Sequence, residues 1–175
     1  MTDVNGDGTP DIVAFDAAVG TNTTQGALAI LLGLPSGNFQ AALIEQLSDL
    51  PGSEAAVADF NRDGKPDIAT LEQAQGNVAV MLNNLLPTPH QGGRSFQTPV
   101  TLTTGTGNMA DSVTVGDFNH DGLTDIAVSY LEDNAVQVLI NNGSGFNAST
   151  SYPVGKHSHG SETTMATVIR STMNW

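Results

Sequence analysis

Short stretches with apolar residues at every second position recur along this chain and predict β-strands. The clearest three are residues 27–32, 77–82 and 135–140. Because residues two apart in a strand share a face, each stretch predicts an apolar stripe that packs against the neighbouring sheet. The stripes are Leu28, Ile30 and Leu32, then Val78, Val80 and Leu82, then Val136, Val138 and Ile140.

Each alternating stretch belongs to a repeating unit of four predicted strands. A Gly/Ser turn that ends in Phe follows it in every unit. The other strands are predicted at residues 55–58 and 112–115 (lead-in strands), 12–15, 68–71 and 126–130 (lead-out strands), and 42–44, 99–102 and 152–154 (last strands). Four short strands repeated radially make β-propeller blades. The sequence therefore predicts an all-β fold of about three antiparallel four-stranded blades, the first of which lacks its lead-in strand.

A nine-residue acidic motif precedes the lead-out strand of each unit. Its copies span residues 3–11, 59–67 and 117–125, and they begin 56 and 58 residues apart. Side-chain oxygens at positions 1, 3, 5 and 9, a turning Gly at position 6 and the carbonyl of position 7 match a loop that wraps Ca²⁺. Three carboxylates in one loop repel one another, so each loop should be loose without the ion. The predicted ligands are Asp3, Asn5, Asp7, Thr9, Asp11, Asp59, Asn61, Asp63, Lys65, Asp67, Asp117, Asn119, Asp121, Leu123 and Asp125.

An EF-hand is the competing interpretation of this motif, and the sequence argues against it. An EF-hand loop closes with a bidentate Glu at position 12 and lies between helices. Position 12 here is Ala14, Thr70 and Val128, and the flanking segments are predicted strands. The motif is therefore predicted to be a metal loop inserted in a β-turn.

Charge and composition support this interpretation and exclude others. The net charge is -13, and the three motifs hold nine of the 18 acidic residues, so three Ca²⁺ ions would reduce the charge to about -7. Only five residues are Lys or Arg, too few to neutralise many phosphates, and no nucleic-acid partner is expected. No stretch is long and apolar enough to predict a membrane span. The chain has no Cys, so calcium is the one cross-link that the sequence predicts.

The order of these elements resembles a known family. A small apolar strand, Asp-Phe-Asn-x-Asp-Gly-x-x-Asp-Ile-Ala-Val, an alternating strand and Gly-x-Gly-Phe are similar to the FG-GAP/VCBS repeats of integrin-α-type β-propellers. The resemblance covers residues 2–160 and implies a calcium-stabilised propeller, typically seven-bladed. Such propellers occur in extracellular adhesion proteins, in lectins and as accessory domains of polysaccharide-active enzymes. The resemblance also implies the same calcium ligands and an extracellular or cell-surface location.

The two ends of the chain depart from the family pattern. We assign repeats to residues 1–160 and an atypical tail to residues 161–175, where a fourth motif is due near residue 166 or 167 but is missing. The tail is interpreted as a truncated or frameshifted fourth repeat. No export signal precedes the first motif, so we expect a lost signal or a fragment of a longer protein. Three blades do not close a ring of four to eight. We expect a truncated piece of a longer propeller, and the alternative is a six-bladed ring assembled from two copies.

Two classes of function fit these patterns, and neither assigns catalytic residues to this chain. The first is a non-catalytic binding module whose longer loops, residues 21–26 and 85–93, contact a glycan or an extracellular protein. The second is an accessory propeller fragment of a secreted polysaccharide-active enzyme whose catalytic domain is absent here. The histidines His120, His157 and His159 are predicted to be exposed to solvent rather than to form a site.

Overall fold

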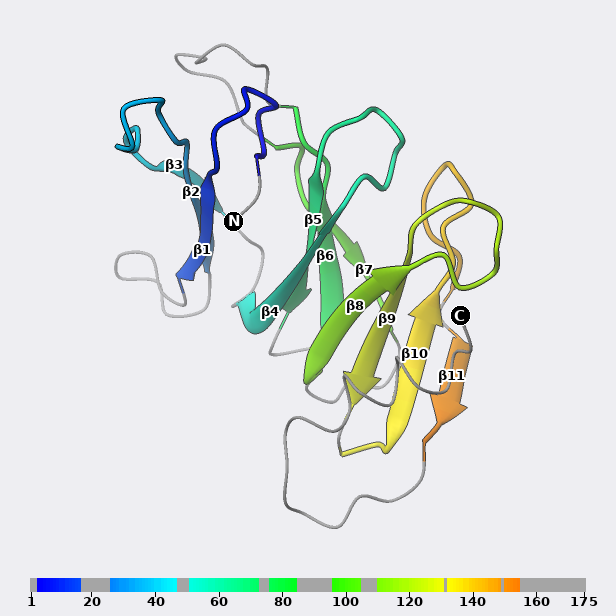
Figure 1. Cartoon of the computed structure of the whole chain (residues 1–175). Coiled ribbons are helices and arrows are strands. Elements are labelled where there is room, and N and C mark those ends of the chain that lie inside the picture. The colour runs from blue at the N-terminus through cyan, green and yellow to red at the C-terminus, as the bar shows by residue number, and fades with distance from the viewer. Residues whose placement is uncertain are drawn as a thin grey trace.

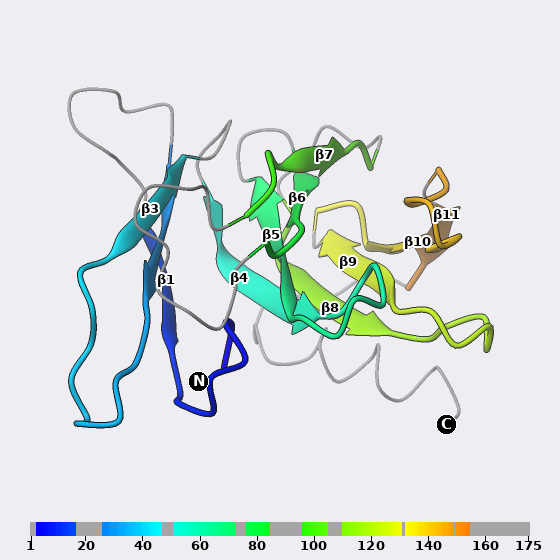
Figure 2. The ribbon, with the colours of Figure 1, turned by 90° about the horizontal axis from the view of Figure 1, so that it is seen from above.

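The fold consists of short β-strands in three separate antiparallel sheets. The computed structural model describes residues 3–16, 26–46, 51–72, 76–84, 96–104, 110–130, 132–148 and 150–154. Within these ranges the chain forms eleven strands, and it contains no helix long and apolar enough to cross a membrane. The second sheet lies between the other two, as Figure 1 and Figure 2 show from the side and from above.

Strands that follow one another in the sequence are neighbours in each sheet. The first sheet has the order β1 (Ile12–Asp16), β2 (Ala27–Leu31) and β3 (Leu43–Gln46). The second has the order β4 (Pro51–Ala58), β5 (Asp67–Glu72), β6 (Asn77–Met81) and β7 (Val100–Leu102). In the third, β8 (Ser112–Gly116) pairs with β9 (Asp125–Tyr130), β9 with β10 (Ala135–Leu139), and β10 with β11 (Thr150–Pro153). The lead-in strands β4 and β8 contact each other, so they form the inner edges at which these two sheets meet.

All eleven predicted strands are present, and most of them begin and end within two residues of the predicted positions. The exception is β4, which begins at Pro51 because an irregular register between Pro51 and Ala55 lets the strand continue backwards along β5. The first sheet has three strands within the described residues, and no lead-in strand pairs with β1 there. The sheets have the form of propeller blades, and they do not close a ring.

Apolar side chains between the sheets form the core, as the predicted stripes require. Leu28, Ile30 and Leu32 of the first sheet cluster with Ile68 and Met81 of the second. The second stripe packs in the same way on the third sheet, in a cluster that includes Ile126, Val128, Tyr130 and Leu139. In the third sheet Val136 and Val138 are buried beside Ala127. The contacts of the first two stripes with the next sheet are thus confirmed.

Four strands are buried on both faces, which the alternating pattern alone did not predict. Every residue of β5, β6, β9 and β10 is buried. The second sheet is covered on both sides by its neighbours (Figure 2), so its central strands have no face left for solvent. Small side chains occupy positions between the larger residues of the stripes, as Ala79 does between Val78 and Val80.

Candidate metal centres

The three acidic loops share one hydrogen-bonding pattern. The Asp at position 1 accepts the backbone N–H of position 5 on one carboxylate oxygen and that of position 6 on the other. In the first loop Asp3 accepts these bonds from Asp7 at 3.1 Å and from Gly8 at 2.8 Å. Asp59 and Asp117 accept the equivalent bonds at the same two distances, 3.1 and 2.8 Å. The first carboxylate therefore closes the loop in every copy.

Positions 3 and 5 of each loop form a second set of bonds. The side-chain amide of Asn5 donates to Asp7 Oδ2 at 2.9 Å, and Asp7 Oδ1 accepts the N–H of Thr9 at 2.8 Å. Donors to the charged form favour it, so the Asn5 amide and, to a smaller degree, the Thr9 N–H lower the pKa of Asp7. In the third loop the pKa of Asp121 is also lowered, most of all by the N–H of Leu123. Both carboxylates are exposed and stay charged at neutral pH.

Two positions of each loop have left-handed backbone angles. At position 6, Gly8, Gly64 and Gly122 have φ angles of 85°, 82° and 81°, which confirms the predicted sharp turn. Position 4 is left-handed too, with φ angles of 59° at Arg62 and 61° at His120. Sequence reasoning missed this second turn, although the first loop has a glycine at position 4 that signalled it. The side chain of His120 is exposed, as predicted.

The Asp at position 9 joins each loop to the hairpin that follows. Asp67 accepts the N–H of Phe60 on Oδ2 and that of Asn83 on Oδ1, both at 2.8 Å. Asp11 and Asp125 make the equivalent bonds, and all three side chains are 0% exposed. The position-9 aspartates thus hold the loops on the sheets, a role that the calcium spacing did not predict.

Burial raises the pKa of Asp67, because a charged carboxylate loses hydration inside the protein. The N–H bonds from Asn83 and Phe60 act in the opposite direction, and the negative charges of Asp63 and Asp59 raise the pKa further. Burial and repulsion together favour neutralisation of this carboxylate, by a proton or by a cation.

An Asn after the alternating strand ties neighbouring sheets together. The side-chain amide of Asn83 donates to the carbonyl of Val4 at 2.6 Å and to that of Pro66 at 2.9 Å. Asn141 donates in the same way to the carbonyl of Phe60, at 2.8 Å. In both cases the acceptor at loop position 2 belongs to the preceding sheet. The acidic loops are therefore also the places at which the sheets are joined.

One basic side chain connects the second loop to the third. The guanidinium of Arg62 donates a hydrogen bond to the carbonyl of Gly122. Its positive charge also contributes to lowering the pKa of Asp121. The electrostatic environment of the third loop thus depends on a residue of the second.

The donors of each loop suit Ca²⁺ in chemical type, because every predicted ligand atom is an oxygen, which hard cations prefer. Within the part of the chain that the structure describes, no three His, Cys, Asp or Glu side chains converge closely enough to hold a metal ion. The carboxylates bind the N–H groups of their own loops. Each carboxylate has about four lone-pair sites, so these bonds leave acceptor capacity for a cation. Calcium binding by the predicted ligands stays a prediction.

Several predicted features lie outside the described residues. These are residues 21–25 of the first longer loop, residues 85–93 of the second, His157 and His159, and the whole tail at residues 161–175.

Comparison with protein-family models gives one match. The model of the FG-GAP-like repeat matches residues 3–70 and residues 59–128, so each match begins at the first residue of an acidic loop. Each match continues through that loop, the strands of its sheet and the next loop into the following lead-out strand. Together the two matches cover more than two thirds of the chain. A comparison with curated proteins gives no match.

Proposed function

The chain belongs to the FG-GAP-like repeat family, and on this basis we propose that it is a calcium-binding, non-catalytic β-propeller module of an extracellular protein. The observation that carries the proposal is the threefold loop geometry. All three loops have the same hydrogen bonds at position 1 and lie at the same end of their sheets (Figure 1). A repeated set of oxygen donors suits a structural ion at each blade.

Five positions of each loop would supply oxygens to the ion. They are the carboxylates at positions 1, 5 and 9, the amide oxygen at position 3 and the carbonyl at position 7. In the second loop these are Asp59, Asp63, Asp67, Asn61 and Lys65. The position-9 carboxylates would link the ion to the sheet, since they already accept N–H bonds from the loop and from the following hairpin. Ion binding would therefore stiffen each loop and its attachment together.

Thermal unfolding with and without calcium tests the proposed ion sites. Extracellular sites of this kind bind at roughly 10⁻⁴ to 10⁻³ M, and a site at 100-fold saturation gains about 2.7 kcal/mol. We expect about 10 mM Ca²⁺ to raise the Tm relative to EDTA. The rise should be smaller for Asp63→Ala, which leaves the first and third loops intact.

The control for this experiment is Glu132→Ala, which removes an exposed acidic side chain outside the loops. It should keep the full calcium-dependent rise in Tm. Melting curves that coincide in EDTA and in Ca²⁺ would refute calcium binding.

We also propose that the ligand of the module is a glycan or another extracellular protein, as in adhesion proteins and lectins. Family membership supports this proposal, and so does the presence of three loops at one end of the sheets, where calcium would hold them in a fixed arrangement. A glycan array probed with folded protein in Ca²⁺ and in EDTA tests the glycan arm. Calcium-dependent binding to a defined glycan class is the expected result, and a blank array would direct the search to protein ligands.

A further inference from the structure

The inner edge of β1 has no strand paired with it in the described part of the chain. The lead-out strands β5 and β9 pair on this edge with the lead-in strands β4 and β8, whereas β2 is the one described strand that pairs with β1. An open strand edge presents unpaired N–H and C=O groups that can pair with another extended segment.

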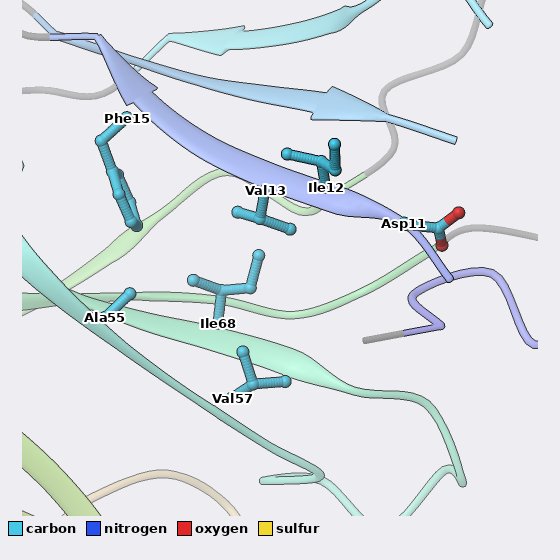
Figure 3. Close-up of a pocket in the computed structure, with 7 residues that line it drawn as sticks. All are labelled: Asp11, Ile12, Val13, Phe15, Ala55, Val57 and Ile68. Atoms are coloured by element: carbon cyan, nitrogen blue, oxygen red, sulfur yellow. The ribbon is translucent and has the colours of Figure 1, made fainter. Parts of the chain in front are cut away.

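An apolar groove lies beside this open edge. It has a volume of about 470 Å³ and lies between β1 and the inner strands of the second sheet. Figure 3 shows Val13 and Phe15 of β1 on one side, and Ala55 and Val57 of β4 on the other. Val57 is 39% exposed. At the junction of the second and third sheets the corresponding space is filled, because β8 packs there with Val113 buried.

The sequence contains a further segment with the pattern of a lead-in strand. Residues 160–166 read Gly-Ser-Glu-Thr-Thr-Met-Ala, and residues 52–58, which form most of β4, read Gly-Ser-Glu-Ala-Ala-Val-Ala. The two segments are identical at four of seven positions. Thr suits a strand, because its branched side chain packs well on a pleated surface. Residues 167–175 contain no acidic motif, so the segment has the pattern of a lead-in strand without the loop that follows the other lead-in strands.

We propose that residues 160–166 of a second copy of this chain pair antiparallel with β1 and complete its first blade. In the second sheet Val57 of β4 pairs with Ile68 of β5, and the alignment transfers this register to the open edge. The expected pairs are Thr163 with Ala14, Thr164 with Val13, and Met165 with Ile12.

The side chains of the segment fit the groove by size. Thr164 and Ala166 take the places of Ala56 and Ala58, whose small side chains pack from β4 against the third sheet. In the completed first blade they would face Ala55 and Val57 across the groove. Small residues suit this place because the inner strands of neighbouring blades lie close together.

Residues 160–166 of the same chain cannot pair with β1, because the distance from the end of β11 to the open edge of β1 is too long. Residues 160–166 follow β11 in the third sheet, and the second sheet separates this sheet from β1 (Figure 1). Two sheet spacings amount to about 20 Å, and crossing from the outer to the inner strand adds about 14 Å sideways. The five residues 155–159 span at most about 18 Å when fully extended, which is shorter than the diagonal of about 24 Å that these two distances give.

A second copy can place its residues 160–166 beside β1 without this long connection. Its third sheet would also cover the exposed face of β1. A segment that follows the third sheet brings that sheet alongside the first sheet of the partner, where Ile12 is 36% exposed. If each copy gives one strand and receives one, the two copies form a closed ring of six blades. Six lies within the range of known propellers. The strand exchange involves no predicted calcium ligand. Experiments can therefore refute the exchange without refuting the proposed ion sites, and the reverse also holds.

Disulfide trapping tests the exchange, and the chain suits it because it contains no cysteine of its own. Val13→Cys and Thr164→Cys variants are mixed and oxidised, and so are Ala14→Cys and Thr163→Cys variants. Adjacent pairs of an antiparallel ladder alternate in geometry, so one of the two mixtures presents the closer pair of side chains. We expect a covalent species of twice the 18.1 kDa chain mass.

Two controls define the outcomes of the trapping experiment. Val13→Cys mixed with Ser171→Cys should give no covalent dimer, because Ser171 lies outside the aligned segment. A chain that carries both Val13→Cys and Thr164→Cys should link to other copies. An internal disulfide in monomers, or no dimer in either mixture, would overturn the proposal.

Light scattering after size exclusion gives a second measurement that needs no cysteine variant. The unmodified chain should have the mass of a dimer. Thr164→Pro should become monomeric, since proline removes an N–H from the donated strand, whereas Ser171→Pro should remain dimeric. A monomeric unmodified chain overturns strand exchange, and a ladder of larger species overturns the closed six-bladed ring.

Discussion

The lead-out strands of the first and second sheets have the same sequence pattern but differ in burial. Ile68 in β5 is 0% exposed, whereas Ile12, at the same place in β1, is 36% exposed. Ile68 lies beside a lead-in strand and packs on the apolar stripe of the preceding sheet. In the described part of the chain Ile12 has neither contact. A blade thus buries its central residues largely through its neighbours, and four strands alone are not enough.

The two sheets also differ at the residue after the alternating strand. Asn83 in the second sheet reaches back to the loop of the first, but the first sheet has Gly33 at this place. A Cβ on Gly33 would lie 2.3 Å from the carbonyl oxygen of Pro10, so no larger residue fits without movement of the backbone. Among the described sheets, the two that follow another sheet have this amide, at Asn83 and Asn141.

The largest expected effect separates the two isoleucines. Ile68→Ala should lower the free energy of unfolding by about 4 kcal/mol, because it leaves a cavity in a packed core. Ile12→Ala should cost about 1 kcal/mol in the monomer, since much of its side chain is already in water. Urea unfolding of both variants in monomeric samples measures the difference. Equal costs would show that the exposure of β1 does not describe the protein in solution.

The next effect concerns the aspartates of one loop. Asp67→Ala leaves the buried N–H groups of Phe60 and Asn83 without their acceptor, and each buried unsatisfied group costs about 1 to 3 kcal/mol. We expect a loss of about 3 kcal/mol in EDTA as well as in Ca²⁺. Asp63→Ala removes an exposed carboxylate and should cost less than about 1 kcal/mol in EDTA. A loss at Asp67 that appears only in Ca²⁺ would contradict its structural role.

A smaller effect is expected at the amide that joins the sheets. Asn83→Ala removes the hydrogen bonds to the carbonyls of Val4 and Pro66 and should cost about 2 kcal/mol. The exposed neighbour Asn84 provides the matched control, and Asn84→Ala should change the free energy of unfolding by less than about 0.5 kcal/mol. If both variants unfold at the same urea concentration, the amide does not stabilise the junction.

The smallest effect at neutral pH involves the junction of the second and third sheets. The hydroxyl of Tyr130 donates to the carbonyl of Gly76, and burial raises the pKa of Tyr130 from 10.0 to about 12, with a minor contribution from Asp133. The unfolded chain therefore releases this proton at lower pH than the folded chain does. The stability contributed by this group is complete below pH 10 and falls as the pH rises towards 12.

Tyr130→Phe should cost about 1 kcal/mol at neutral pH and should weaken the loss of stability between pH 10 and 12. Unfolding free energies measured at several pH values in this range test the slope. The control is Tyr152→Phe, at a position that is 51% exposed. An unchanged slope in Tyr130→Phe would show that another group titrates there.

Much of the fold could be predicted because its signals are local. Alternation over six residues located β2, β6 and β10, and the spacing of Asp, Asn and Gly located the three loops and their turn at position 6. The motif named the oxygen donors, but it could not show that Asp67 binds two N–H groups of the protein. One of those groups belongs to Asn83, 16 residues away, and local spacing carries no information about such a partner.

The junctions between sheets were missed for the same reason. Asn141 and the carbonyl of Phe60 are 81 residues apart, and an Asn at the end of a strand is otherwise typical of a turn. A signal was present, however, in the recurrence of Asn-Asn directly after the second and third alternating strands, at residues 83–84 and 141–142. The bond from Arg62 to Gly122 has no equivalent in the first loop, where position 4 is Gly6. No recurring sequence pattern therefore indicated it.

The Asn junction also has an evolutionary consequence. The amide that reaches back and the carbonyl that receives the next amide both lie within one repeat, so a duplicated repeat brings both halves of the connection with it. A gene can then grow or shrink by whole blades, without a matching mutation elsewhere in the chain. Recombination could then change the number of blades in such a lineage, because each added repeat contains both the Asn amide and the carbonyl that connect neighbouring blades.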